Sequence, residues 1–165
     1  MIDDNFGSNQ LFGDQGDDVL DGTDGHSDVE LNVSVAEYCL TDTLSGGAGN
    51  DTLIGDDSEV MAGGDGNDEF AVARDFARAQ VAAQIVDFNV AEDALKIDGT
   101  ALSSTSIAYA FDSVQGGVIA SVAGEEVAVL QGLVALIFQQ LPRRLLKGDP
   151  KGVVQFVSLV ARATA

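Results

Sequence analysis

Large apolar residues recur at a period of nine along the first part of the chain. The blocks start at residues 4, 13, 22, 37, 46, 55 and 63, with a break at 31–36 and one residue missing from block 55–62. Each block has one apolar slot near its end: Leu11, Leu20, Val29, Leu44, Leu53, Met61 and Phe70. One apolar residue per block fits a three-residue strand whose middle side chain faces inward. The pattern predicts seven turns, each followed by a short strand.

The residues before each slot predict tight turns that offer oxygen atoms. Glycine recurs at positions one, two and four, where it allows positive φ and leaves carbonyl oxygens uncovered. Aspartate fills position six in four blocks: Asp18, Asp42, Asp51 and Asp68. Calcium takes six to eight hard oxygens at about 2.3–2.6 Å, and carbonyls and carboxylates supply them. These turns therefore favour calcium binding.

A three-residue strand is not stable alone, so the blocks are expected to wind into a coil whose turns alternate between two edges. Sites would then form between turns two blocks apart. This rule pairs Asp51 with Asp68. It also pairs Asn9 with Ser27, and Asp18 with Asp42 if the insertion at 31–36 loops out.

Two blocks, GGAGNDTLI (46–54) and GGDGNDEFA (63–71), resemble the hemolysin-type calcium-binding repeat of the RTX proteins. The resemblance implies an all-β fold, a calcium-binding parallel β-roll followed by a β-rich C-terminal cap, with several Ca2+ ions. It implies these ligands: Gly46, Gly49, Asp51, Gly63, Gly66 and Asp68. Asp65, at position three, is an open case between ligand and surface charge. Block 4–12 has Asn9 at position six, block 22–30 has Ser27, and block 55–62 lacks the glycine pair and the aspartate.

Beyond the repeats, glycine density falls and the period of nine ends. We expect repeats over 4–71, a capping module over 72–140, and a basic tail of unassigned structure over 141–165. Residues 85–100 look like the segment that follows the repeats in exported RTX proteins, with these matching residues: Asp87, Phe88, Asp93, Ile97 and Asp98. Alternating apolar residues over 116–133 predict a β-hairpin around Gly124. For 72–84, a short helix and an irregular strand both remain open.

Charge narrows the choice of partners. Residues 1–71 hold 18 of the 27 acidic residues and none of the eight Lys and Arg, which argues against nucleic-acid binding and favours cations. A single Cys39 and a single His26 disfavour a zinc site. The first residues lack the basic region and apolar run of a secretory signal, so no cleaved N-terminal signal is expected, and no stretch of the sequence is long and apolar enough to predict a membrane span. Five acids outside position six are expected to be surface charge: Asp14, Asp17, Asp56, Asp57 and Glu59.

These features indicate a binding and folding module that is not an enzyme, since the chain has no His-Glu-x-x-His and no phosphate-binding loop. The fixed period argues against an acidic disordered linker. Calcium is expected to fold the module, and the resemblance to exported RTX proteins implies that this happens after export to the extracellular space of a bacterium through a type I secretion apparatus. One alternative is the detached C-terminal domain of a larger secreted protease, lipase or toxin, whose catalytic domain lies upstream. Another is a calcium-dependent adhesive or surface-layer component.

Overall fold

A computed structural model describes residues 1–3, 8–23, 41–56, 58–73, 81–98, 107–122 and 124–133. Within these ranges the regular elements are twelve strands and no helix. The strands are β1 (Ile2–Asp3), β2 (Gln10–Phe12), β3 (Val19–Asp21), β4 (Thr43–Ala48), β5 (Thr52–Gly55), β6 (Val60–Asp65), β7 (Glu69–Ala73), β8 (Ala83–Ile85), β9 (Ala94–Asp98), β10 (Ile107–Asp112), β11 (Gly117–Val122) and β12 (Glu125–Gln131).

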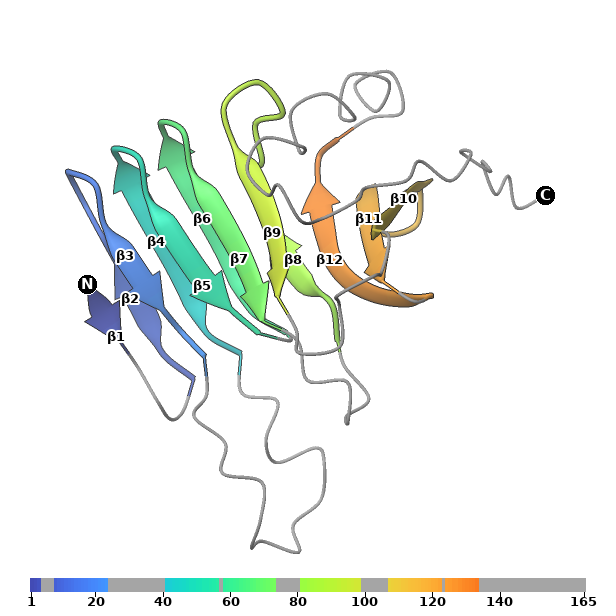
Figure 1. Cartoon of the computed structure of the whole chain (residues 1–165), viewed down its shortest axis with the longest axis horizontal. Helices are drawn as coiled ribbons and strands as arrows, with labels where there is room; N and C mark the ends of the chain where they lie inside the picture. The colour runs from blue at the N-terminus through green and yellow to red at the C-terminus, as the bar shows by residue number, and fades with distance from the viewer. Residues whose placement is uncertain are drawn as a thin grey trace, which may run out of the picture.

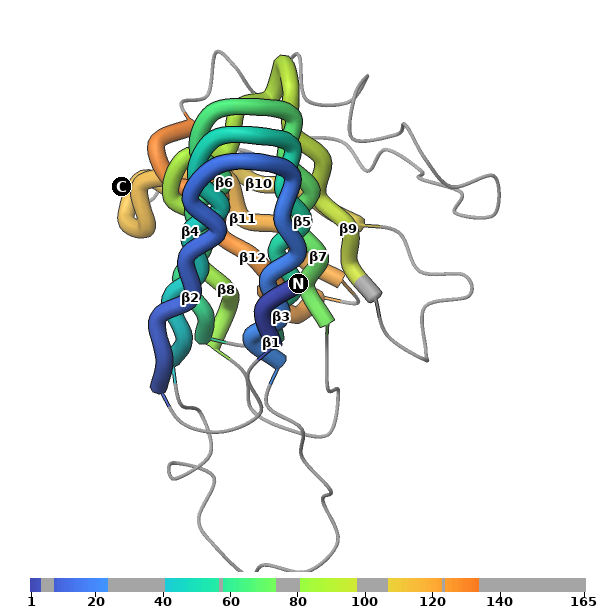
Figure 2. The backbone as a smooth tube through the Cα atoms, turned by 90° about the vertical axis from the view of Figure 1, so that its left-hand side faces the viewer, coloured from blue at the N-terminus to red at the C-terminus, as the bar shows by residue number. Residues whose placement is uncertain are grey.

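The strands form two sheets that face each other (Figure 1). One has five strands in the order β1-β3-β5-β7-β9, and the other has seven in the order β10-β11-β12-β8-β6-β4-β2. From β1 to β9, odd-numbered strands lie in one sheet and even-numbered strands in the other, and all neighbouring strands among them are parallel. Figure 2 shows the resulting coil along its axis, with the chain crossing from sheet to sheet at a turn. The predicted all-β parallel roll is confirmed.

The apolar slots line the core of the roll. Leu20, Leu53 and Phe70 are register partners in the first sheet, and Leu95 continues the row. The second sheet has a matching row of Leu11, Leu44, Met61 and Ile85. All eight side chains are buried in one cluster. The structure thus confirms six of the seven predicted slots, and Val29 lies outside the described residues.

The prediction of seven stacked turns is wrong in one place. β2 pairs directly with β4, and β3 with β5, so block 22–30 supplies no strand between them. The six residues 31–36 break the period of nine, so the spacing alone did not show which blocks would become neighbours across them.

The C-terminal strands extend the second sheet. β12 runs parallel to β8, and β11 lies between β10 and β12 and is antiparallel to both. Gly124, with φ +91°, lies in the turn between β11 and β12, which confirms the predicted hairpin. For the open stretch 72–84, the structure gives strand up to Ala73 and again from Ala83, while 74–80 lie outside the described residues.

Candidate calcium site

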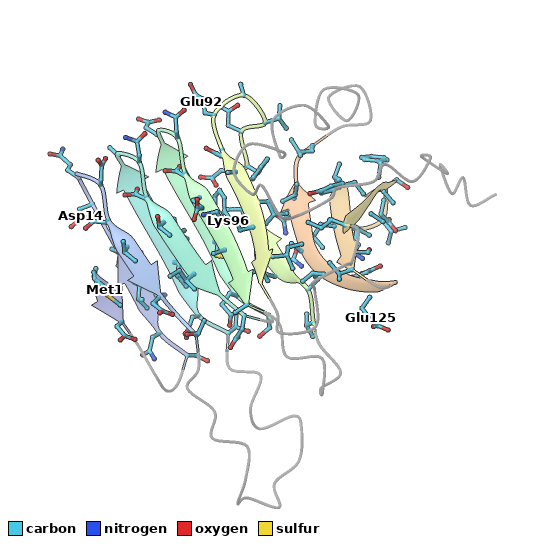
Figure 3. All side chains as sticks on the ribbon, viewed as in Figure 1. Met1, Asp14, Glu92, Lys96 and Glu125 are labelled. Atoms are coloured by element: carbon cyan, nitrogen blue, oxygen red, sulfur yellow. The ribbon has the colours of Figure 1, made fainter. Side chains whose placement is uncertain are left out.

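One edge of the roll carries four turns stacked on one another. They connect β2 to β3 (13–18), β4 to β5 (46–51), β6 to β7 (63–68) and β8 to β9 (86–93). In Figure 3 this edge runs from Asp14 in the first turn to Glu92 in the last. The first three are repeat turns of six residues, and the fourth belongs to the segment after the repeats.

Glycine at position four is needed for the turns to stack. Gly49 and Gly66 have φ of +146° and +141°, as the repeat pattern predicts. A methyl group built on Gly66 would lie 1.7 Å from the carbonyl oxygen of Gly49, and one built on Gly49 would lie 2.1 Å from that of Gly16. Any side chain at these positions would push the turns apart and move their carbonyl oxygens.

The position-six aspartates form a ladder along the same edge. The backbone N–H of Asp18 donates to Oδ1 of Asp51 (2.8 Å), and that of Asp51 donates to Oδ1 of Asp68 (2.9 Å). The N–H of Asp68 donates in turn to Oδ1 of Asp93 (3.1 Å). Each aspartate therefore ties its own turn to the turn before it.

The second oxygens of two ladder aspartates lack a hydrogen-bond partner. Asp51 and Asp68 are only 1% and 2% exposed, and the Oδ2 atom of each is buried without a donor. A methyl group on Gly46 would lie 2.4 Å from Asp51 Oδ2 and 2.6 Å from the Gly63 carbonyl oxygen, so these two oxygens converge on one point. A buried carboxylate oxygen without a donor either takes up a proton or lies beside a cation, and an all-oxygen set suits calcium. The residues present fit the ion.

The electrostatics of this edge point the same way. Burial raises the pKa of Asp68 above its ordinary value, the Asp51 N–H partly offsets this, and the negative charge of Asp93 adds to the rise. Burial also raises the pKa of Asp93, against backbone hydrogen bonds from Asn89 and Asp68. Within the part of the chain that the structure describes, the one ion pair joins Lys96 to Glu69. Keeping the buried carboxylates of the ladder ionised therefore costs free energy, and a bound cation would lower that cost.

The predicted pairing of Asp51 with Asp68 matches the ladder, whereas the pairing of Asp18 with Asp42 is wrong. Asp18 lies on the ladder edge beside Asp51, and Asp42 lies on the opposite edge, where its Oδ1 accepts from the Asn9 N–H (2.7 Å). Asn9 thus pairs with Asp42 instead of Ser27, which lies outside the described residues. The reason is again the break at 31–36: β2 pairs with β4 and β3 with β5, so the neighbouring turns are shifted by one block from those that the spacing rule gave.

Glu59 was expected to be surface charge, and that expectation is wrong, since the residue is 0% exposed. It precedes the apolar slot Met61 by two residues, as Asp51 precedes Leu53. A methyl group on Gly55 would lie 3.2 Å from Glu59 Cγ, so this glycine faces the acid much as Gly46 faces Asp51. Counting backward from the slot would have identified Glu59 as the position-six residue. The missing residue of block 55–62 falls earlier in its turn.

Other acids follow the expectations more closely. The side chains of Asp14, Asp17 and Asp65 are exposed, and Asp56 is half-buried. Asp17 Oδ1 accepts from the Asn50 N–H (2.8 Å), and Asn50 Oδ1 accepts from the Asn67 N–H (3.0 Å). This second, position-five ladder was missed, although Asp or Asn occupies that position in three turns. Asp57, His26 and Cys39 lie outside the described residues.

Comparison with known proteins agrees with this geometry. The family model of the RTX calcium-binding nonapeptide repeat matches residues 1–28 and 41–70, in four copies. No curated protein and no solved structure matches the chain. Among the described residues no helix is long and apolar enough to cross a membrane.

Proposed function

Since residues 1–28 and 41–70 are RTX calcium-binding nonapeptide repeats, we propose that this chain holds Ca2+ between the stacked turns of its ladder edge and uses the ions to fold an exported module. The RTX repeat is a binding module that takes up Ca2+. What we add is the assignment of the ions to particular turns and the consequence for folding.

The best-supported site lies between turns 46–51 and 63–68. Asp51 and Asp68 would supply carboxylate oxygens, and the glycine carbonyls of the two turns would supply the rest: Gly46, Gly49, Gly63 and Gly66. The observation that carries this assignment is the burial of two carboxylate oxygens without a hydrogen-bond donor. A second site between turns 13–18 and 46–51 would use Asp18, because Asp18 and Asp51 repeat the same ladder contact. Bound calcium would supply charge neutralisation and a tie between turns.

Asp42 is a candidate for the opposite edge. It is 1% exposed and accepts the Asn9 N–H as Asp51 accepts that of Asp18. Glu59, fully buried at the equivalent place in the next turn of that edge, is the natural companion ligand. Asp65 is a weaker candidate, because its side chain is exposed on the ladder edge.

Folding would depend on calcium for two physical reasons. The 18 acidic residues of 1–71 face no Lys or Arg in that segment, and they repel one another in the compact state. Each coil contributes only two apolar slots to the core, which leaves little hydrophobic free energy to offset chain entropy. Calcium binding free energy would then become folding free energy. Such a chain would stay unfolded in a calcium-poor cytoplasm and fold outside the cell.

The test is a calcium titration followed by far-UV circular dichroism and by equilibrium dialysis of the bound ion. The wild type should gain β signal and bind more than one Ca2+. The double variant Asp51→Ala/Asp68→Ala should bind fewer ions, whereas Asp3→Ala/Asp14→Ala, which removes the same charge from exposed positions, should retain the wild-type number. A wild-type β signal that is the same in chelator and in millimolar calcium would contradict the proposal.

A further inference from the structure

The fourth turn of the ladder edge, 86–93, differs from the repeat turns below it. It is two residues longer and contains no glycine. It also bonds to itself: the Asn89 carbonyl oxygen accepts from the N–H groups of Glu92 (3.0 Å) and Asp93 (2.8 Å). Its Asn89 Oδ1 accepts from the Ala91 N–H (3.0 Å). A carbonyl oxygen occupied inside its own turn is not directed at an ion shared with the neighbouring turn.

Two carboxylates of this turn instead contact the last repeat turn. Asp87 Oδ1 accepts from the Gly63 N–H (2.9 Å), and Asp87 Oδ2 accepts from the Gly64 N–H (3.0 Å). In the first repeat turn, the equivalent N–H of Gly13 donates to a backbone oxygen, that of Ser45 (2.9 Å). At the end of the repeats a side chain has thus replaced the backbone of a further coil.

Asp93 stands where the next position-six aspartate would stand, but its bonding differs. Its Oδ1 continues the ladder by accepting from the Asp68 N–H (3.1 Å). Its Oδ2 accepts from the Asn89 N–H (2.7 Å), whereas the Oδ2 atoms of Asp51 and Asp68 have no donor. Both oxygens of Asp93 are therefore satisfied by the protein itself.

The neighbouring apolar residue anchors the turn. Phe88 is 4% exposed and packs against Phe70, the last apolar slot of the repeats, with ring centroids 5.8 Å apart. Phe88 packs into the core, while the adjacent Asp87 contacts the preceding turn 63–68, so the two side chains fix the segment both in the core and at the ladder edge.

We propose that Asp87 and Asp93 end the series of calcium sites. Their carboxylate oxygens accept hydrogen bonds from the backbone N–H groups of turn 63–68 on the side that no further repeat turn covers, so that turn 86–93 stacks there without a third ion. Asp87 and Asp93 are positioning residues in this scheme. They hold the backbone of Gly63, Gly64 and Asp68, and the Gly63 carbonyl oxygen converges with Asp51 Oδ2 at the place proposed for the last ion. The inference rests on the proposed function, because it concerns where the series of calcium sites stops.

The test is amide hydrogen exchange by NMR on the full chain in saturating calcium, together with the number of ions bound. In the wild type the Gly63 and Gly64 amides should be protected. In Asp87→Asn their exchange should rise by at least about tenfold, since an amide offers one acceptor where the carboxylate offers two, and hydrogen bonds to charged groups are the stronger ones. The number of bound ions should not change.

The matched control is Asp112→Asn. Asp112 Oδ1 also accepts two backbone N–H groups, those of Val114 (2.6 Å) and Gln115 (3.2 Å), but in the β10–β11 turn. This variant should leave both glycine amides protected. A loss of one bound ion in Asp87→Asn would overturn the inference, because Asp87 would then be a ligand of a third site.

Failure of the inference differs from failure of the proposed function. A wild-type chain that binds calcium but leaves the Gly63 and Gly64 amides unprotected would overturn only the role inferred for Asp87 and Asp93. This measurement does not depend on whether any variant folds. A wild-type chain that binds no calcium would overturn the proposed function itself.

Discussion

Replacing Asp51 and Asp68 of the ladder by asparagine should make the roll more stable without calcium and less stable with it. The double variant Asp51→Asn/Asp68→Asn keeps the side-chain shape and keeps an Oδ1 acceptor for the N–H groups of Asp18 and Asp51. It removes two negative charges whose second oxygens are buried without a donor. At the place of Asp51 Oδ2 an amide nitrogen would face the Gly63 carbonyl oxygen, which it could bond.

The size of the effect follows from the burial of these groups. An uncompensated buried carboxylate costs several kcal/mol, so the pair costs on the order of 5–10 kcal/mol. That is most of the roughly 5–15 kcal/mol by which an ordinary domain is stable. A buried amide without a partner costs about 1–3 kcal/mol. In chelator the variant should therefore be more stable than the wild type, by about 3 kcal/mol or more. In calcium the order should reverse, because only the wild type gains the binding free energy.

Folding in chelator can be followed by circular dichroism during titration with trimethylamine oxide, an osmolyte that favours compact states. The asparagine variant should fold at a lower osmolyte concentration than the wild type, and in calcium it should unfold at a lower urea concentration. The control Asp3→Asn/Asp14→Asn makes the same change in net charge at exposed side chains. If variant and control shifted the chelator midpoint equally, total charge rather than burial would set calcium dependence, and the reasoning would be refuted.

Three further predictions test the site, the core and the C-terminal strands. Gly46→Ala should weaken calcium binding at least tenfold in isothermal titration calorimetry, because its methyl group would lie 2.4 Å from Asp51 Oδ2. The control is Gly116→Ala, at a glycine with φ +75° and nothing within 4 Å of the added methyl group. It should cost about 1 kcal/mol of stability and leave the calcium affinity unchanged. Leu53→Ala, at a fully buried slot, should cost about 2–5 kcal/mol in urea unfolding with calcium, and a cost below 1 kcal/mol would contradict the role of the slots in the core. Burial raises the pKa of Tyr109 to about 12. The neutral form therefore contributes fully to the stability of the fold below about pH 10, and this contribution is lost as the pH rises toward 12. Absorbance at 295 nm in a Tyr38→Phe background should show ionisation near pH 12, and a midpoint near 10 would contradict the prediction.

The sequence was sufficient to predict the roll because its signal is periodic and each period has one physical meaning. The apolar slot sets the register: a strand shifted by one residue would turn Leu53 out of the core. The glycines at positions two and four show where the backbone needs positive φ, and Gly47, Gly49, Gly64 and Gly66 all have it. The proposed ligand pair Asp51 and Asp68 followed from the same register and needed no further information.

The parts that could not be predicted are those where the period fails. Which turns become neighbours after block 22–30 depends on how the chain crosses residues 31–36, and a spacing rule carries no information about that path. Glu59 was misjudged because the block was counted from its first glycine, whereas the buried slot fixes the register from the other end. Asp87 gave no signal as a contact of Gly63 and Gly64, since that contact is made by a side chain 23–24 residues away in sequence.

The proposed calcium sites and the end turn 86–93 are two ways of satisfying the buried oxygens of the ladder aspartates. Stacking turns brings position-six carboxylates into the interior, where Asp51 and Asp68 each keep one oxygen without a protein donor. Inside the array Asp51 Oδ2 converges with the Gly63 carbonyl oxygen of the next turn, which is an acceptor and cannot donate to it, so a cation is the partner that suits both oxygens. At the end of the array the following turn need not keep the repeat sequence, and its Asn89 N–H donates to Asp93 Oδ2. The repeats would then respond to calcium, while the junction with the C-terminal strands would hold together through protein groups alone.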